Sequence, residues 1–146
     1  MEKGGLIKKN DIDISKYLSD HGVKVSFQRM RIFTYFVKHR NHPTVNDIYE
    51  EVAKEIPTLS KTTVYNTLSL FVEKNILDVI IIEENETRYD WGECIHGHFK
   101  CDCCKEIYDI GIDINTMKKQ TIDLKGFKIN EHHIYFKGFC PKCIKK

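Results

Sequence analysis

The strongest constraint in this sequence is a set of four cysteines arranged in two C-x-x-C pairs. Cys101 and Cys104 form the first pair, and Cys140 and Cys143 form the second, close to the carboxyl end. Each C-x-x-C turn directs two sulfur atoms toward one point, so two pairs complete a tetrahedral shell of thiolates suited to structural zinc. The sequence therefore predicts a zinc site that ties the last segment of the chain to an earlier one.

Two alternatives to this zinc site stay open. The pairs also suit unrelated buried or redox-active thiols, and Cys103 offers a different register through Cys101-x-Cys103. The C-x-x-C spacing suits chelation better, so Cys103 is predicted to be a free thiol, as is Cys94, and neither is given a redox role.

The chain shows no signal-peptide pattern, and no apolar run approaches the roughly 20 residues of a membrane span. We therefore expect a cytoplasmic protein with no membrane partner. Cysteines stay reduced in the cytoplasm, so they are expected to bind metal and not to form disulfides. The formal net charge of +2 is too small to indicate a polyanionic partner by itself.

The sequence changes character near residue 88, because all six cysteines and most histidines follow that point. We predict an α+β protein with two domains, residues 1–88 and 89–146. Ser26, Thr44 and Ser60 have the residue types and positions of helix N-caps, while Gly22 and Asn75 suit left-handed helix ends. Residues 76–82 and 87–91 then predict a hairpin, so the first domain reads as a winged helix-turn-helix with residues 60–74 as its second helix.

The second domain is predicted to be a small α/β unit. Its expected strands cover residues 96–100, 107–110 and 127–136, and its expected helix covers residues 114–124.

A second group of potential metal ligands lies just before the first cysteine pair. His96 and His98 are two residues apart, so a strand places both imidazoles on one face. Asp90 and Asp109 each fall near the end of an expected strand. Mixed imidazole and carboxylate ligands suit iron or manganese better than an all-sulfur site does, although each of these residues alone is unremarkable.

In combination, these motifs resemble the ferric uptake regulator family. The stretch NHPTVNDIY from Asn41, the segment SKTTVYNTL from Ser60, the H-x-H-x-x-C-x-x-C run and the closing C-x-x-C match that family in order and spacing. The resemblance covers nearly the whole chain. It implies an N-terminal winged-helix DNA-binding domain, a dimerisation domain, and structural Zn²⁺ on the four paired cysteines.

The resemblance also implies a regulatory site for Fe²⁺ or Mn²⁺ between the two domains. Its five ligands in the peroxide-stress repressor branch match residues that are all present here: His42, Asp90, His96, His98 and Asp109. Iron-sensing members usually carry glutamate at the position of Asp109, which favours the peroxide branch. A further metal site of many relatives is expected to be incomplete, because Ile95 and Gly97 flank His96 and carry no ligand atom.

The expected partner is double-stranded operator DNA, bound by a homodimer. On the second helix of the helix-turn-helix, Lys61 and Thr62 are predicted to meet phosphates, and Thr63, Tyr65 and Asn66 to meet base edges. The resemblance points most firmly to Tyr65. Gln28, Arg29 and Arg31 are further candidates for phosphate contacts.

By analogy with the family, hydrogen peroxide is the only small molecule expected to act on the protein. Bound ferrous iron would react with it and oxidise His42 or His96, releasing operator DNA; this damage is stoichiometric, so no enzyme is predicted. The alternatives are a reversible iron- or zinc-responsive repressor, a metalloenzyme using His96, His98 and Asp109, and a zinc-stabilised adaptor that binds protein.

Overall fold

The computed structural model describes residues 12–83, 85–92, 96–113, 125–128 and 133–145. The chain divides into two compact units, Met1–Trp91 and Gly92–Lys146, which we treat separately. The boundary predicted after residue 88 falls inside strand β2 (Glu86–Asp90), whose pairing with β1 keeps Asp90 in the first unit. No helix among the described residues is both long and apolar enough to cross a lipid bilayer.

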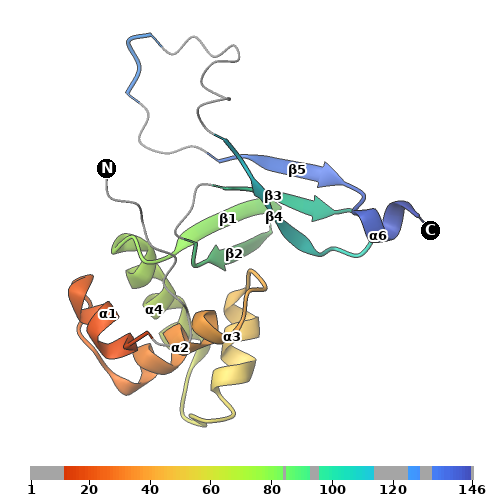
Figure 1. The fold of residues 1–146 in the computed structure, drawn as a ribbon. Helices are drawn as coiled ribbons and strands as arrows, with labels where there is room; N and C mark the ends of the chain where they lie inside the picture. Colours follow the sequence, from red (N-terminus) through yellow and green to blue (C-terminus); the bar gives the residue numbers. More distant parts are fainter. Residues whose placement is uncertain (1–11, 84, 93–95, 114–124, 129–132, 146) are drawn as a thin grey trace. The chain divides into compact units, whose positions relative to one another are not determined.

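Four helices form the body of the first unit (Figure 1): α1 (Ile14–Asp20), α2 (Phe27–Lys38), α3 (Val45–Val52) and α4 (Lys61–Glu73). Their predicted caps are confirmed. Ser26, Thr44 and Ser60 each accept a hydrogen bond from a backbone amide in the first turn, and Thr44 forms a reciprocal capping box with Asp47. Gly22 and Asn75 have φ angles of 78° and 57°, as expected for left-handed helix ends.

An aromatic cluster packs these helices against Trp91, the residue that follows β2. The ring of Phe33, which is fully buried on α2, stacks on Tyr17 at 5.1 Å and meets the edges of Phe71 and Trp91 at 5.9 and 5.0 Å. The indole Nε1 of Trp91 donates a hydrogen bond to the Tyr17 hydroxyl at 3.2 Å. Helices α1, α2 and α4 therefore share one core with the end of the first unit.

Strands β1 (Asp78–Glu83) and β2 (Glu86–Asp90) form the predicted antiparallel hairpin after α4. Asp78 pairs with Asp90 and Ile80 with Arg88, and the register shifts toward the tip. A helical body followed by a two-stranded wing confirms the predicted winged-helix unit.

The second unit is built on a three-stranded sheet with the order β4-β3-β5, formed by β3 (His96–Cys101), β4 (Ile107–Gly111) and β5 (Tyr135–Gly138). Strand β3 runs antiparallel to β4 but parallel to β5. A short helix, α6 (Pro141–Ile144), follows. Because parallel strands end at the same side of a sheet, the ends of β3 and β5 bring Cys101 and Cys140 to one place.

The predicted strand at 127–136 is wrong in its bounds. Phe127 and Lys128 are exposed and are not in a strand, and β5 begins only at Tyr135 and continues to Gly138. Phe127 has no described sheet neighbour that would bury it, so its hydrophobic character misplaced the start. The helix predicted at 114–124 lies outside the described residues.

Replacing Phe33 by alanine is expected to lower the free energy of unfolding by about 3–5 kcal/mol, because it leaves a cavity between the three remaining aromatic rings. Chemical denaturation followed by Trp91 fluorescence measures this loss. Phe27→Ala is the control, since this ring is 65% exposed on the same helix. Equal losses in the two variants would contradict the description of this core.

Candidate metal centres and nucleic-acid interface

The second unit brings all four paired cysteines together. One sulfur atom from each of Cys101, Cys104, Cys140 and Cys143 lies within 4.8 Å of every other. Cys101 ends β3 and Cys143 lies in α6, so the cluster joins strand, turn and helix. Lys105, with a φ angle of 64°, turns the chain so that the amide of Cys101 can bond the carbonyl of Glu106 at 3.0 Å.

The geometry of this cluster fits zinc. Four sulfur ligands about 2.3 Å from a central zinc ion lie about 3.8 Å from one another. The sulfur atoms of Cys104 and Cys140 are 3.9 Å apart. The backbone amide of Cys140 donates to the sulfur of Cys101 at 3.4 Å, a contact that stabilises a thiolate. A closed set of four sulfur donors is suited to a structural role, because it leaves no position for substrate.

Hydrogen bonds inside the cluster already favour deprotonated sulfur. The Tyr108 hydroxyl on β4 donates to the Cys140 sulfur and lowers the pKa of that thiol to about 6. Hydrogen bonding with Cys140 raises the pKa of Cys143 instead. The lowered pKa of Cys140 favours its thiolate form, which is the form of cysteine that binds a metal ion.

Cys103 lies beside this cluster but is exposed, and it does not belong to the group of four. The structure thus assembles the C-x-x-C register and not the Cys101-x-Cys103 alternative. Cys94 lies outside the described residues.

A histidine and a carboxylate face each other within the sheet of the second unit. His98 on β3 pairs with Asp109 on β4, and its Nε2 lies 3.5 Å from the Asp109 carboxylate. The His98 ring is buried while the carboxylate is half exposed. His96 takes the strand position two residues earlier, opposite Gly111. Between them, Gly97 carries no ligand atom, and a Cβ atom there would lie 2.6 Å from the end of the Ile112 side chain and 3.3 Å from the Ile134 carbonyl oxygen.

The first unit contains a second pair of the same chemistry. The Nε2 atom of the buried His42 lies 3.9 Å from the carboxylate of Asp90, the last residue of β2. His42 has a backbone φ angle of 50°, which residues other than glycine rarely adopt. Four of the five predicted ligands thus form two imidazole and carboxylate pairs, one in each unit. His133, exposed, contacts the Tyr135 hydroxyl at 3.4 Å, and His132 lies outside the described residues.

Helix α4 presents the predicted DNA-contacting residues on its exposed side. Val64, Thr67 and Leu68 face the core, whereas four of the five predicted residues are exposed: Lys61, Thr62, Tyr65 and Asn66. The fifth, Thr63, is half buried, and its hydroxyl shares a hydrogen bond with Ser60 at 2.9 Å. The Lys61 ammonium lies 5.4 Å from the centre of the Tyr49 ring, which holds its side chain against α3.

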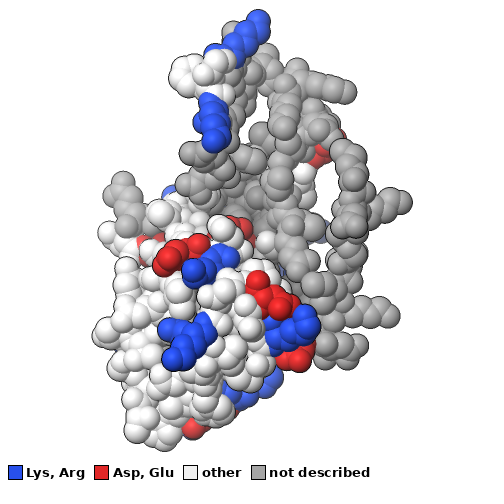
Figure 2. Space-filling model, turned by 90° about the vertical axis from the view of Figure 1, so that its left-hand side faces the viewer, with Lys and Arg blue, Asp and Glu red and all other residues white. Residues whose placement is uncertain are grey.

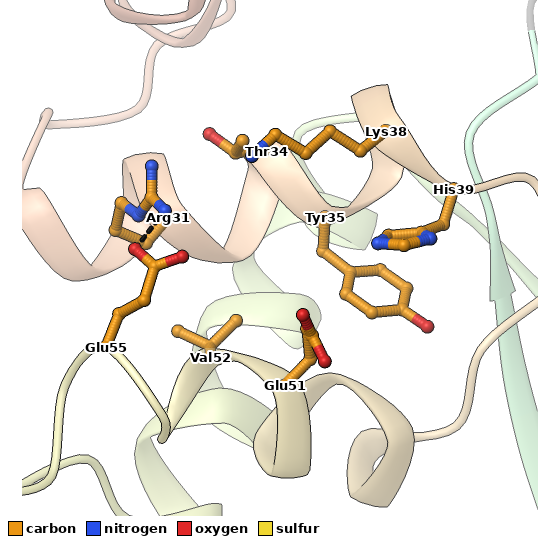
Figure 3. A pocket seen from close by; sticks show the side chains of 8 residues that line it. All are labelled: Arg31, Thr34, Tyr35, Lys38, His39, Glu51, Val52 and Glu55. Carbon is orange, nitrogen blue, oxygen red and sulfur yellow. Dashed lines mark hydrogen bonds and ion pairs between the residues drawn. The ribbon is translucent and has the colours of Figure 1, made fainter.

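Two of the predicted phosphate contacts on α2 are engaged within the protein. The Arg31 guanidinium pairs with Glu55 in a groove between α2 and α3, which Figure 3 shows from close by. Arg29 donates to the carbonyl of Lys24 at 2.7 Å. Acidic and basic side chains are interspersed on the face seen in Figure 2. A nucleic acid would therefore be recognised by local contacts more than by a large field of one sign.

Two residues that sequence reasoning left without a role contact the sites. Tyr108 bonds the cysteine cluster, and Arg88 bonds the backbone of His42. Glu86, Arg88 and Asp90 alternate in the sequence, which places all three on one face of a strand. This alternation could have indicated that Arg88 lies on the same face as the predicted ligand Asp90.

Cys140→Ser is expected to abolish tight zinc binding and to unfold the second unit, because three sulfurs do not close the shell. Metal analysis after dialysis against a mild chelator, with circular dichroism, measures both. Cys103→Ser is the matched control and should retain one zinc ion per chain. Loss of zinc from the control would revive the alternative register.

Comparison with known proteins agrees with this architecture. The chain is 32% identical to the peroxide operon regulator of Bacillus subtilis over 132 residues, which cover 88% of this chain and 90% of that protein. It is 27% identical to the peroxide-responsive repressor PerR of Staphylococcus aureus, with 88% of each chain covered. The ferric uptake regulator of Helicobacter pylori has the same fold, with a TM-score of 0.74, 19% identity, and 90% and 89% of the two chains aligned.

The profile of the ferric uptake regulator family matches residues 20–137, a span that holds the whole wing, both imidazole and carboxylate pairs and the first cysteine pair. The match therefore includes both units. Together with the Bacillus subtilis relative, it shows that the chain belongs to the ferric uptake regulator family.

Proposed function

We propose that this protein is a metal-dependent repressor that binds operator DNA as a homodimer in the cytoplasm and releases it on exposure to hydrogen peroxide. The observation that carries the proposal is the occurrence of one imidazole and carboxylate pair in each unit, His42 with Asp90 and His98 with Asp109. Membership of a family of metal-responsive transcriptional regulators supports it.

In this proposal the two pairs ligate a single Fe²⁺ or Mn²⁺ ion, with His96 as the fifth ligand. Nitrogen and oxygen donors suit these ions, whereas the sulfur cluster suits Zn²⁺, so the two sites do not compete for the same metal. The four cysteines Cys101, Cys104, Cys140 and Cys143 serve as a permanent structural site.

Ligands drawn from both units couple metal occupancy to the arrangement of those units. Side chains of both units can share one ion only where the units approach each other, so ligation favours that arrangement over others. In a homodimer the arrangement sets the separation of two recognition helices, and only one separation matches two half-sites on DNA. The metal thus acts as a co-repressor.

The peroxide response is the finer part of the proposal. It is supported by Asp109, which stands where iron-sensing relatives usually carry glutamate, and by the curated relatives named for peroxide regulation. The residues His42, Asp90, His96, His98 and Asp109 would hold Fe²⁺, which would supply the electrons that reduce hydrogen peroxide next to its histidine ligands. His42 and His96 are the residues proposed to be oxidised, and the loss of a ligand ends DNA binding without turnover.

Operator binding by the anaerobic protein, loaded with Fe²⁺ or with Mn²⁺, tests this function. We expect both forms to bind, and a small excess of peroxide to abolish binding by the iron form alone. Peptide mass spectrometry should then find one added oxygen on the peptide that holds His42 or His96. Binding that survives peroxide but follows free iron or zinc reversibly would replace the proposal with the metal-supply alternative.

Asp109→Glu tests the assigned branch within the same assay. Glutamate keeps the charge but moves the carboxylate by one methylene, so we expect metal-dependent DNA binding to persist while histidine oxidation falls at least several-fold. Unchanged oxidation would show that Asp109 does not set the peroxide response.

Tyr65→Ala is expected to weaken operator binding by about tenfold or more, because a base-edge contact contributes about 1–3 kcal/mol. Binding to unrelated DNA should change little. Fluorescence anisotropy at fixed salt measures both affinities, and Phe27→Ala, which removes another exposed ring outside helix α4, is the control. An equal loss on both DNAs would argue against base recognition by Tyr65.

A further inference from the structure

Three consecutive residues of β2 hold the chain segment that carries His42. The Arg88 Nη1 atom donates to the His42 carbonyl at 3.1 Å, and the Tyr89 amide donates to the Pro43 carbonyl at 3.0 Å. The Asp90 carboxylate then lies 3.9 Å from the His42 imidazole. The same strand thus bonds the backbone of this segment and places a carboxylate near the His42 side chain.

The backbone of His42 needs such support. Its φ of 50° lies in the left-handed region, which is unfavourable for a residue with a Cβ atom. Pro43 follows directly, and a residue before proline prefers extended backbone. Conformations of this kind persist where surrounding contacts impose them. Among the hydrogen bonds of the described residues, the one from Arg88 reaches the His42 carbonyl.

Arg88 is itself fixed. Its Nε and Nη2 atoms bond the Glu86 carboxylate at 3.1 and 3.0 Å, and its side chain is largely buried. A planar guanidinium held on two nitrogens has little freedom left, so its third nitrogen points in one direction. Glu86, Arg88 and Asp90 alternate along β2 and therefore share one strand face, opposite the buried Tyr89.

We propose that Arg88, held by Glu86, is a positioning residue that keeps His42 in its left-handed conformation and aims its imidazole at Asp90. This inference rests on the proposed role of His42 as a regulatory metal ligand. Through its charge alone, Arg88 would weaken metal binding, because a guanidinium repels a cation. Removal of Arg88 therefore weakens metal binding if positioning dominates, and strengthens it or leaves it unchanged if only charge matters.

Manganese affinity, measured by electron paramagnetic resonance of free Mn²⁺ on zinc-loaded protein, separates these outcomes. We expect Arg88→Met to weaken Mn²⁺ binding about tenfold and Glu86→Gln to weaken it less. Arg40→Met, which removes the same charge two residues before His42, should not weaken binding. Arg88→Lys keeps the charge without the planar fork and should restore only part of the affinity.

A double-mutant cycle tests whether Arg88 acts through His42. His42→Ala weakens Mn²⁺ binding, and Arg88→Met should add no further loss in that background. Losses that multiply in the double variant would overturn the proposal. So would wild-type affinity in Arg88→Met.

Hydrogen exchange gives a readout without metal. In metal-free Arg88→Met, the Tyr89 amide that bonds Pro43 should exchange faster than in wild type, while amides in the middle of α4 keep their protection. Unchanged exchange at Tyr89 would overturn the proposal. If wild type binds no Mn²⁺, or His42→Ala binds it as wild type does, the proposed function fails instead, and the exchange result still decides whether Arg88 holds the segment.

Discussion

The parallel pairing of β3 with β5 is the constraint on which the chemistry of the second unit depends. Parallel strands end at the same side of a sheet, so the residues after them meet even though a long stretch of chain separates them. Here Cys101 ends β3 and Cys140 follows β5, and their C-x-x-C partners complete the cluster from the turn after β3 and from helix α6. A zinc ion bound there would in turn hold β3 and β5 together, which would stabilise this small three-stranded sheet.

The antiparallel pairing of β3 with β4 adds the second chemistry. It sets His98 directly opposite Asp109, while Tyr108, the residue before Asp109 on β4, bonds the sulfur cluster. Strand β4 thus carries one residue that contacts the cysteine cluster and one proposed ligand of the regulatory metal. The donor types keep the two apart, because sulfur closes around zinc, whereas imidazole and carboxylate suit iron or manganese.

Local features of the fold were predictable from the sequence because each has a local cause. Ser60 caps α4 through its own side chain, Asn75 ends a helix through its own φ angle, and the C-x-x-C spacing positions its own two sulfurs. Nonlocal features were not. The start of β5 depends on pairing with β3, and the hydrophobic Phe127 suggested a longer strand that no described neighbour would bury.

The same distinction applies to the sites. The residue types of His42 and Asp90 were readable, and the family resemblance grouped them, but the left-handed backbone of His42 was not readable from the sequence. Arg31 suggested a phosphate contact because it is basic and lies on a helix, yet it pairs with Glu55 in the turn that follows α3. Which charged residue pairs with which is decided by packing between elements, and one sequence alone does not contain that information.

The central claim is that the His42 and Asp90 pair and the His98 and Asp109 pair bind one and the same ion. A crystal structure of the zinc-loaded protein with Mn²⁺, with diffraction data collected at the manganese absorption edge, tests it most directly. The account predicts one manganese peak per chain, about 2.0–2.3 Å from a nitrogen of His42 and a nitrogen of His98, which are distances typical of such ligands. A peak bound by only one of the two pairs, or separate peaks at each pair, would contradict it.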